Sequence, residues 1–99
     1  MDKLSRLQRF ILMALLDKSK ISKPQRELSQ EIYRAFFHCD SHAEYLPRAR
    51  ASLSRAYRRL EERGLIKRVQ RCWCLTNIPL NGVLVARRLR RDIEVRISQ

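Results

Sequence analysis

The sequence predicts an α+β fold that is mostly helical, with a short β-hairpin ahead of the last helix. Apolar residues recur at helical spacing in four segments, two β-prone runs follow a glycine, and 99 residues are enough for one modest core. We therefore expect a single domain over residues 1–99. It should comprise an N-terminal helix (1–19), a central unit of helices and hairpin (22–76) and a C-terminal helix (79–97).

The N-terminal helix is apolar around much of its circumference. One stripe consists of Leu4, Leu7, Ile11, Ala14 and Leu15, and further apolar surface comes from Phe10, Leu12, Met13 and Leu16. A helix on a protein surface normally has one apolar face. We therefore expect a second element of the chain, or a second subunit, to cover the remainder.

A second helix is predicted to begin after Ser22, because Pro24 and Gln25 follow it in the pattern of a helix start. Its apolar stripe ends near Phe37 and consists of Leu28, Ile32, Ala35 and Phe36. The connector before it, Lys20–Lys23, has room for one short strand.

The next segment, His38–Leu46, has no clear apolar period. Within it, Ser41 and Glu44 have the spacing of a capping box for a brief helical turn. Its role is not predicted.

A long third helix is predicted from about Pro47 to Arg63, because proline suits the first helical position and Gly64 suits a left-handed cap. At about 100° per residue, its core-facing stripe is Ala49, Leu53, Ala56, Tyr57 and Leu60. The opposite face carries Arg48, Ala51, Arg55, Arg58, Arg59 and Glu62, with Ser52 and Ser54 beside it. This face is cationic and contains small residues.

The hairpin and the last helix follow. The strands are expected at Leu65–Val69 and Cys72–Thr76, with Gln70 and Arg71 at the tip. The last helix has an apolar face of Leu80, Val83 and Leu84 and the ladder Val85, Leu89, Ile93 and Ile97. Its other face carries Arg87, Arg88, Arg90 and Arg91, which either extend a binding surface or keep the helix soluble.

The charge of the chain indicates a polyanionic partner. Lysine and arginine total 22 against 10 acidic residues, a formal charge of +12 that is spread from Arg6 to Arg96. Arginine outnumbers lysine, which suits recognition of phosphates and base edges. The longest apolar run, Phe10–Leu16, is too short to span a bilayer and has no cleavage site after it. We therefore expect a cytoplasmic protein, associated with the nucleoid if it is bacterial.

The order helix, helix, long basic helix, hairpin, helix resembles the winged helix-turn-helix fold over residues 22–86. The likeness is sharpest in Leu60–Arg68 and Trp73–Thr76, which are similar to the L-E-x-x-G-L-I-x-R and aromatic-x-L-T signatures of MarR-like transcriptional regulators. The resemblance implies that the third helix enters the DNA major groove and that the hairpin tip reaches the adjacent backbone or minor groove. It also implies a homodimer through the helices Leu4–Leu16 and Leu80–Ile97.

We therefore predict sequence-specific binding of double-stranded DNA by a transcriptional regulator. The expected contacts are Arg48, Arg50, Ser52, Arg55, Arg58, Arg59, Gln70 and Arg71. Guanidinium groups can pair bidentately with a guanine edge or a phosphate. Two alternatives stay open at this point: an RNA-binding or ribosome-associated winged helix, and a protein-interaction module.

Other chemistry finds less support. His38, Cys39, His42, Cys72 and Cys74 suggest zinc, but the one-residue gap between Cys72 and Cys74 is a poorer chelate than the usual two-to-four-residue spacing of zinc ligands. No metal or cofactor is therefore predicted. The three cysteines are expected to be reduced. Carboxylates without a pairing pattern and only two glycines argue against an enzyme. Tyr57 and Trp73 lie on core-facing stripes and are expected to pack rather than bind bases.

Overall fold

The structure, a computed structural model, describes residues 4–16, 21–38, 47–76 and 81–98. The elements within these ranges are α1 (Arg6–Leu15), β1 (Ser22–Pro24), α2 (Gln25–Ala35), α3 (Pro47–Glu62), β2 (Ile66–Val69), β3 (Cys72–Leu75) and α4 (Gly82–Ser98). The α+β, mostly helical class predicted from the sequence is confirmed. None of the described helices combines the length and apolar character needed to cross a membrane.

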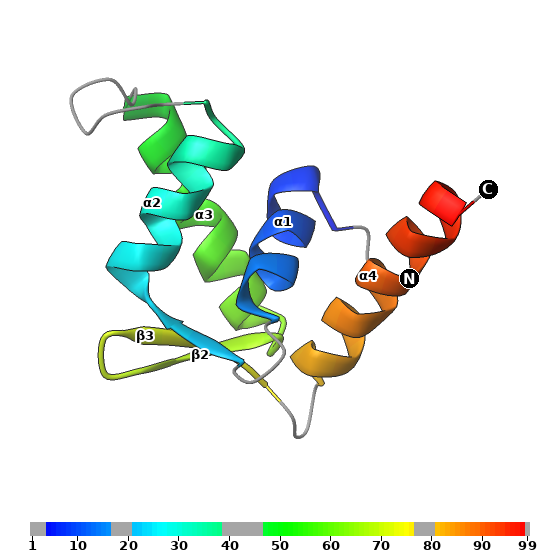
Figure 1. Ribbon diagram of the computed structural model, residues 1–99. Helices are drawn as coiled ribbons and strands as arrows, with labels where there is room; N and C mark the ends of the chain where they lie inside the picture. Colours follow the sequence, from blue (N-terminus) through cyan, green and yellow to red (C-terminus); the bar gives the residue numbers. More distant parts are fainter. Residues whose placement is uncertain (1–3, 17–20, 39–46, 77–80, 99) are drawn as a thin grey trace.

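The three strands form one antiparallel sheet in the order β1-β3-β2. Helices α1, α2 and α3 lie on one side of the sheet (Figure 1). The predicted hairpin is confirmed, with Gln70 in the left-handed region at its tip (φ 56°). The last strand in sequence is therefore the central strand of the sheet.

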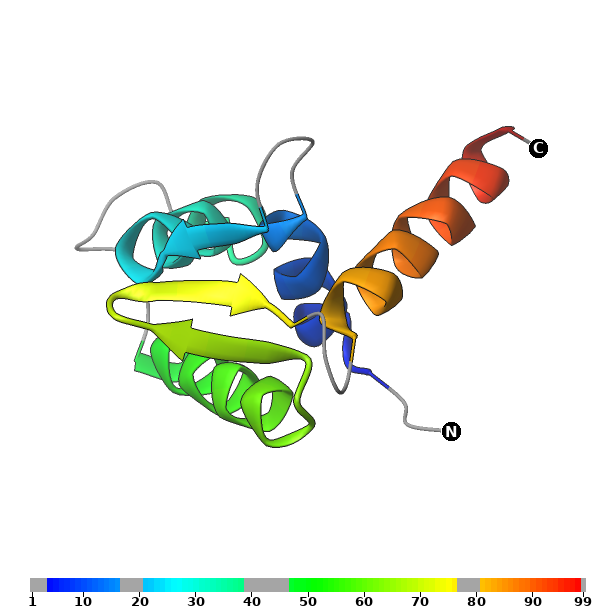
Figure 2. The same ribbon diagram turned by 90° about the horizontal axis from the view of Figure 1, so that it is seen from below.

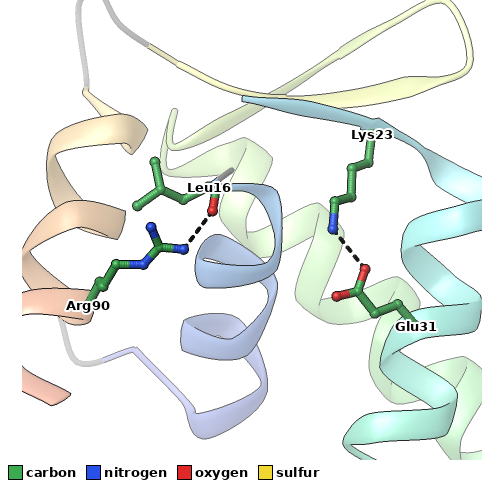
Figure 3. Close-up of polar contacts among 4 residues, drawn as sticks. All are labelled: Leu16, Lys23, Glu31 and Arg90. Atoms are coloured by element: carbon green, nitrogen blue, oxygen red, sulfur yellow. Dashed lines mark hydrogen bonds and ion pairs between the residues drawn. The ribbon is translucent and has the colours of Figure 1, made fainter. Parts of the chain in front are cut away.

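The short strand expected before the second helix is present as β1, but the predicted helix start at Ser22 is wrong. Ser22 pairs with Cys74 across the sheet, which keeps its backbone extended. Pro24 is the N-cap residue, and it makes no side-chain capping bond. The Lys23 ammonium instead ties the strand to α2 through an ion pair of 2.8 Å with Glu31 (Figure 3).

Helix α1 is shorter than predicted and lies at the centre of the fold. It begins at Arg6 because Ser5 and Gln8 form a capping box, with bonds of 3.0 and 3.1 Å. It contacts α2, α3, α4 and β3, and Ile11, Leu12 and Leu15 are fully buried. Other elements of the chain therefore cover most of its apolar surface. Residues 1–3 and 17–19, which the prediction included, lie outside the described residues.

Helix α3 agrees with its predicted pattern. The whole expected core stripe is buried: Ala49, Leu53, Ala56, Tyr57 and Leu60. The helix ends at Glu62, one residue before the expected end. Gly64 then adopts the predicted left-handed conformation (φ 74°). The capping box proposed at Ser41 and Glu44 lies outside the described residues.

Helix α4 begins at Gly82, three residues later than predicted, and the side chain of Asn81 accepts a bond of 2.9 Å from the Leu84 N–H. The first part of α4 packs against α1, and the far half projects away from the rest of the chain (Figure 2). Of the predicted apolar residues, Val83 is buried, Val85 and Leu89 are half-buried against the core, and Leu84 and Ile93 are 52% and 39% exposed. The predicted apolar face is therefore only partly buried, and the side chain of Ile97 lies outside the described residues.

A junction at Thr76 joins the hairpin, the turn after α3 and the start of α4. The Thr76 hydroxyl donates to the Gly64 carbonyl and accepts the Gly82 N–H at 3.0 Å. The Thr76 N–H donates to the Leu65 carbonyl at 3.1 Å. A Cβ on Gly82 would overlap that same Leu65 carbonyl oxygen. Only glycine fits this close approach without a shift of the backbone.

Candidate nucleic-acid interface

The predicted contact residues of α3 lie at its surface, opposite the core stripe. Arg48, Arg50, Arg55, Arg58 and Arg59 are exposed, and Ser52 is half-buried. Arg58 is loosely paired with Glu62, with 3.9 Å between Nε and Oε1 and both side chains about two-thirds exposed. Such an exposed pair contributes little to stability, so Arg58 can leave it for another anion at low cost.

These arginines do not all point in one direction. At about 100° per residue, Arg55 and Arg58 straddle the centre of the exposed face. Arg50 and Arg59 are nine positions apart and therefore project about 180° from each other. A ligand that contacts the centre of the exposed face of α3 therefore meets cationic side chains on both sides of the helix.

The hairpin tip supplies the second part of the surface. Gln70 and Arg71 are both exposed, and the Arg71 carbonyl accepts a bond of 2.8 Å from the Gln25 N–H at the start of α2. The tip is therefore held to α2. Two further exposed cations, Lys67 and Arg68 on β2, were missing from the predicted site. Their position on the predicted strand next to the hairpin tip could have identified them as part of the site.

A buried aromatic pair sets the position of α3 on the sheet. The rings of Tyr57 and Trp73 stack with centroids 5.2 Å apart at an interplanar angle of 27°. The hydroxyls of Tyr57 and Ser29 are 2.9 Å apart and share a hydrogen bond, which adds α2 to the contact. The predicted core role of Tyr57 and Trp73 is confirmed. The Arg68 guanidinium lies 5.9 Å from the centroid of the Trp73 ring.

The buried Tyr57 hydroxyl predicts a loss of stability at alkaline pH. Burial raises its pKa to about 12 against an opposing effect of the bond to Ser29. In the unfolded chain the Tyr57 hydroxyl loses its proton near pH 10, whereas in the folded protein it keeps this proton until about pH 12. We expect the free energy of unfolding to fall by about 2–3 kcal/mol across that window. Urea denaturation at several pH values measures it, and Tyr57→Phe, which removes the ionisable group, should show a smaller fall.

The arginines of α4 are not equivalent. Arg90 donates from Nη2 to the Leu16 carbonyl at 2.8 Å, at the C-terminal end of α1 (Figure 3). A cation at this position also interacts favourably with the helix dipole. Arg90 therefore attaches α4 to α1, although it is exposed like Arg87, Arg88 and Arg91.

The residues considered for zinc are not gathered in one described place. Cys72 and Cys74 are free, half-buried thiols on the face of β3 opposite Trp73. His38 is exposed at the end of α2, and Cys39 and His42 lie outside the described residues. Within the described ranges no group of three metal-ligating side chains occurs.

The chain was compared with protein-family models, curated proteins and solved structures, and none of them matches it. What supports a function is therefore the layout of the fold and the charge on its surface.

Proposed function

We propose that this chain is a winged helix-turn-helix protein of the MarR-like kind that binds double-stranded DNA sequence-specifically and regulates transcription. The observation that carries the proposal is the exposed arginine face of α3 beside a hairpin that is bonded to the start of α2. The order α2, α3 and a two-stranded hairpin is compatible with a winged helix layout.

The dimensions and chemistry of α3 suit the major groove of B-DNA. The groove is about 12 Å wide and admits one α-helix. Ala51 and Ser54 are exposed among the arginines, and their small side chains permit a close approach to the bases. Arginine is the side chain best suited to bidentate recognition of guanine.

The contacts divide into base recognition and backbone binding. In the proposal, Arg48, Ser52, Arg55 and Arg59 face the base edges, and Arg50 and Arg58 bind phosphates. Gln70 and Arg71 reach the backbone next to the groove. Lys67 and Arg68 add cationic charge beside them, on the strand that leads to the tip.

A homodimer is part of the proposal. A groove of about 700 Å³ lies between α1, the end of α2 and α4. Its apolar lining includes Phe10, Met13, Leu89 and Ile93, which is where a second copy would pack. Sedimentation of the free protein should show a dimer at the concentrations that bind DNA, and a monomer would contradict this part.

RNA binding is the second candidate, but the described aromatic side chains favour duplex DNA. Proteins that recognise single-stranded RNA stack its bases on exposed aromatic rings. Each described aromatic residue is buried or half-buried: Phe10, Tyr33, Phe36, Phe37, Tyr57 and Trp73. Groove binding by arginine needs no such exposed ring.

Arg55→Ala tests the proposal, because Arg55 lies near the centre of the exposed face of α3. A preferred duplex is first selected from random sequences, and binding is then measured by fluorescence anisotropy across a salt series. We expect Arg55→Ala to weaken binding to the preferred duplex by about 1–3 kcal/mol and to reduce discrimination against random duplex. Arg34→Ala, which removes the same charge from the far end of α2, is the matched control.

The possible outcomes distinguish sequence-specific DNA binding from the alternative functions. Equal losses on preferred and random duplex would assign Arg55 to a phosphate contact instead of a base. Tighter binding of structured RNA than of duplex would favour the RNA-binding alternative. Absence of binding above low salt would overturn the proposal and favour a protein partner.

A further inference from the structure

The outer face of the sheet carries two cysteines on its central strand. In β3, Cys72 and Cys74 alternate with the buried Trp73 and therefore point to the opposite face. Both thiols are free and half-buried. Figure 2 views the sheet from this side, and the helices lie behind or beside it. The two thiols therefore share a face that no described helix covers.

Strand geometry disfavours a disulfide between these two residues. A strand advances about 3.3 Å per residue, so their Cα atoms are roughly 6.6 Å apart. That separation is at the upper limit for a disulfide, and two Cβ atoms that point the same way stay beyond the required 3.5–4.5 Å. Unless the backbone moves, the pair remains a dithiol.

The same spacing suits one metal ion held in line between two sulfurs. A zinc–thiolate bond is about 2.3 Å long, and two bonds of about this length in a line separate the sulfurs by roughly 4.6 Å. This sulfur separation is about 2 Å shorter than the distance between the two Cα atoms. Each Sγ therefore has to lie about 1 Å closer to the other cysteine than its own Cα does, which staggered rotamers allow. Soft d¹⁰ metal ions form linear two-coordinate complexes with two thiolates.

The neighbours on this face select the kind of ion. The residues paired with the two cysteines are Ser22, Pro24, Lys67 and Val69. They include neither a carboxylate nor an imidazole, so the set falls short of the four ligands that structural zinc requires. Soft thiolate ligands favour Cu(I). Lys67, opposite Cys74, is placed to balance the negative charge of a dithiolate complex.

We propose that Cys72 and Cys74 form a two-coordinate site for Cu(I). Each thiol loses one proton and forms one Cu–S bond, and copper stays in the +1 state. Two neutral thiols and one monovalent cation thus become a complex of charge −1, with two protons released. Lys67 is the one residue that this proposal shares with the proposed DNA interface, and copper binding by the two thiols does not require that DNA is bound.

The test is a titration of the reduced protein with Cu(I), without oxygen, against a chromophoric Cu(I) chelator. We expect one Cu(I) per chain for the native protein. Cys72→Ser and Cys74→Ser should each weaken binding at least 100-fold. Cys39→Ser, which changes the cysteine outside the described residues, should bind like the native protein. Zinc in excess should not displace the copper.

Three results would overturn the proposal: native-like binding by either the Cys72 or the Cys74 variant, loss of binding in Cys39→Ser, or one copper for every two chains. X-ray absorption of the copper-loaded native protein provides a measurement that does not depend on how the variants fold. Two sulfur neighbours and no nitrogen neighbour are expected. A third sulfur or a nitrogen ligand would contradict the two-coordinate site.

Discussion

Trp73→Ala is expected to lower the free energy of unfolding by about 3–5 kcal/mol, the usual cost of removing a large aromatic side chain from a core. Trp73 is 5% exposed and stacks on Tyr57, so alanine would leave a cavity between α3 and the sheet. The loss also removes the ring that Arg68 covers. Urea denaturation of the variant, followed by circular dichroism, measures the change.

The control for this prediction is Cys74→Ala, one residue along the same strand but on the outer face. Because Cys74 is half-buried and outside the core, we expect a loss below about 1 kcal/mol. Trp73→Phe keeps an aromatic ring in the core and should fall between the two. A loss below about 1 kcal/mol for Trp73→Ala would show that the ring does not fill the core as described.

Gly82→Ala is expected to cost about 2–4 kcal/mol, from overpacking and from strained hydrogen bonds. The new Cβ would overlap the backbone carbonyl of Leu65, which cannot rotate away as a side chain could. Relief requires a shift of α4 or of the turn, and either movement stretches the bonds that Thr76 makes there. Thermal or urea denaturation measures the effect.

The sign of this effect distinguishes the explanation from helix propensity. Alanine is more favourable than glycine inside a helix by about 1 kcal/mol, so propensity alone predicts that Gly82→Ala stabilises α4. Leu84→Ala is the matched control, since Leu84 is 52% exposed in the same helical turn. It should change stability by less than about 0.5 kcal/mol. An unchanged or increased stability in Gly82→Ala would contradict the close contact.

Local patterns predicted the parts of the fold that local forces determine. The core stripe of α3, the left-handed Gly64 and the hairpin tip each depend on residues within a few positions. The helix start at Ser22 was wrong because that residue pairs with Cys74, far along the chain. No short-range pattern contains that pairing. The close approach of Gly82 to Leu65 was missed for the same reason.

In the candidate site, too, local patterns predicted some features, whereas contacts between distant parts of the chain determine others. Helical periodicity placed Arg55 and Arg58 on the exposed face, and the structure agrees. The bond from Arg90 to the Leu16 carbonyl depends on how α4 crosses α1, so its sequence position could not separate it from its arginine neighbours. Contact with DNA stays a prediction that the Arg55→Ala experiment tests.

The strand order β1-β3-β2 has a consequence for how the chain folds during synthesis. The strand β1 emerges from the ribosome about 50 residues before β3, with which it pairs, so a long loop must close before the two can meet. The helices α2 and α3 are complete by then, but Trp73 arrives with that late strand. The nascent chain therefore exposes the apolar faces of these helices until the hairpin is synthesised. Closure of the sheet is expected to be the slow step of folding.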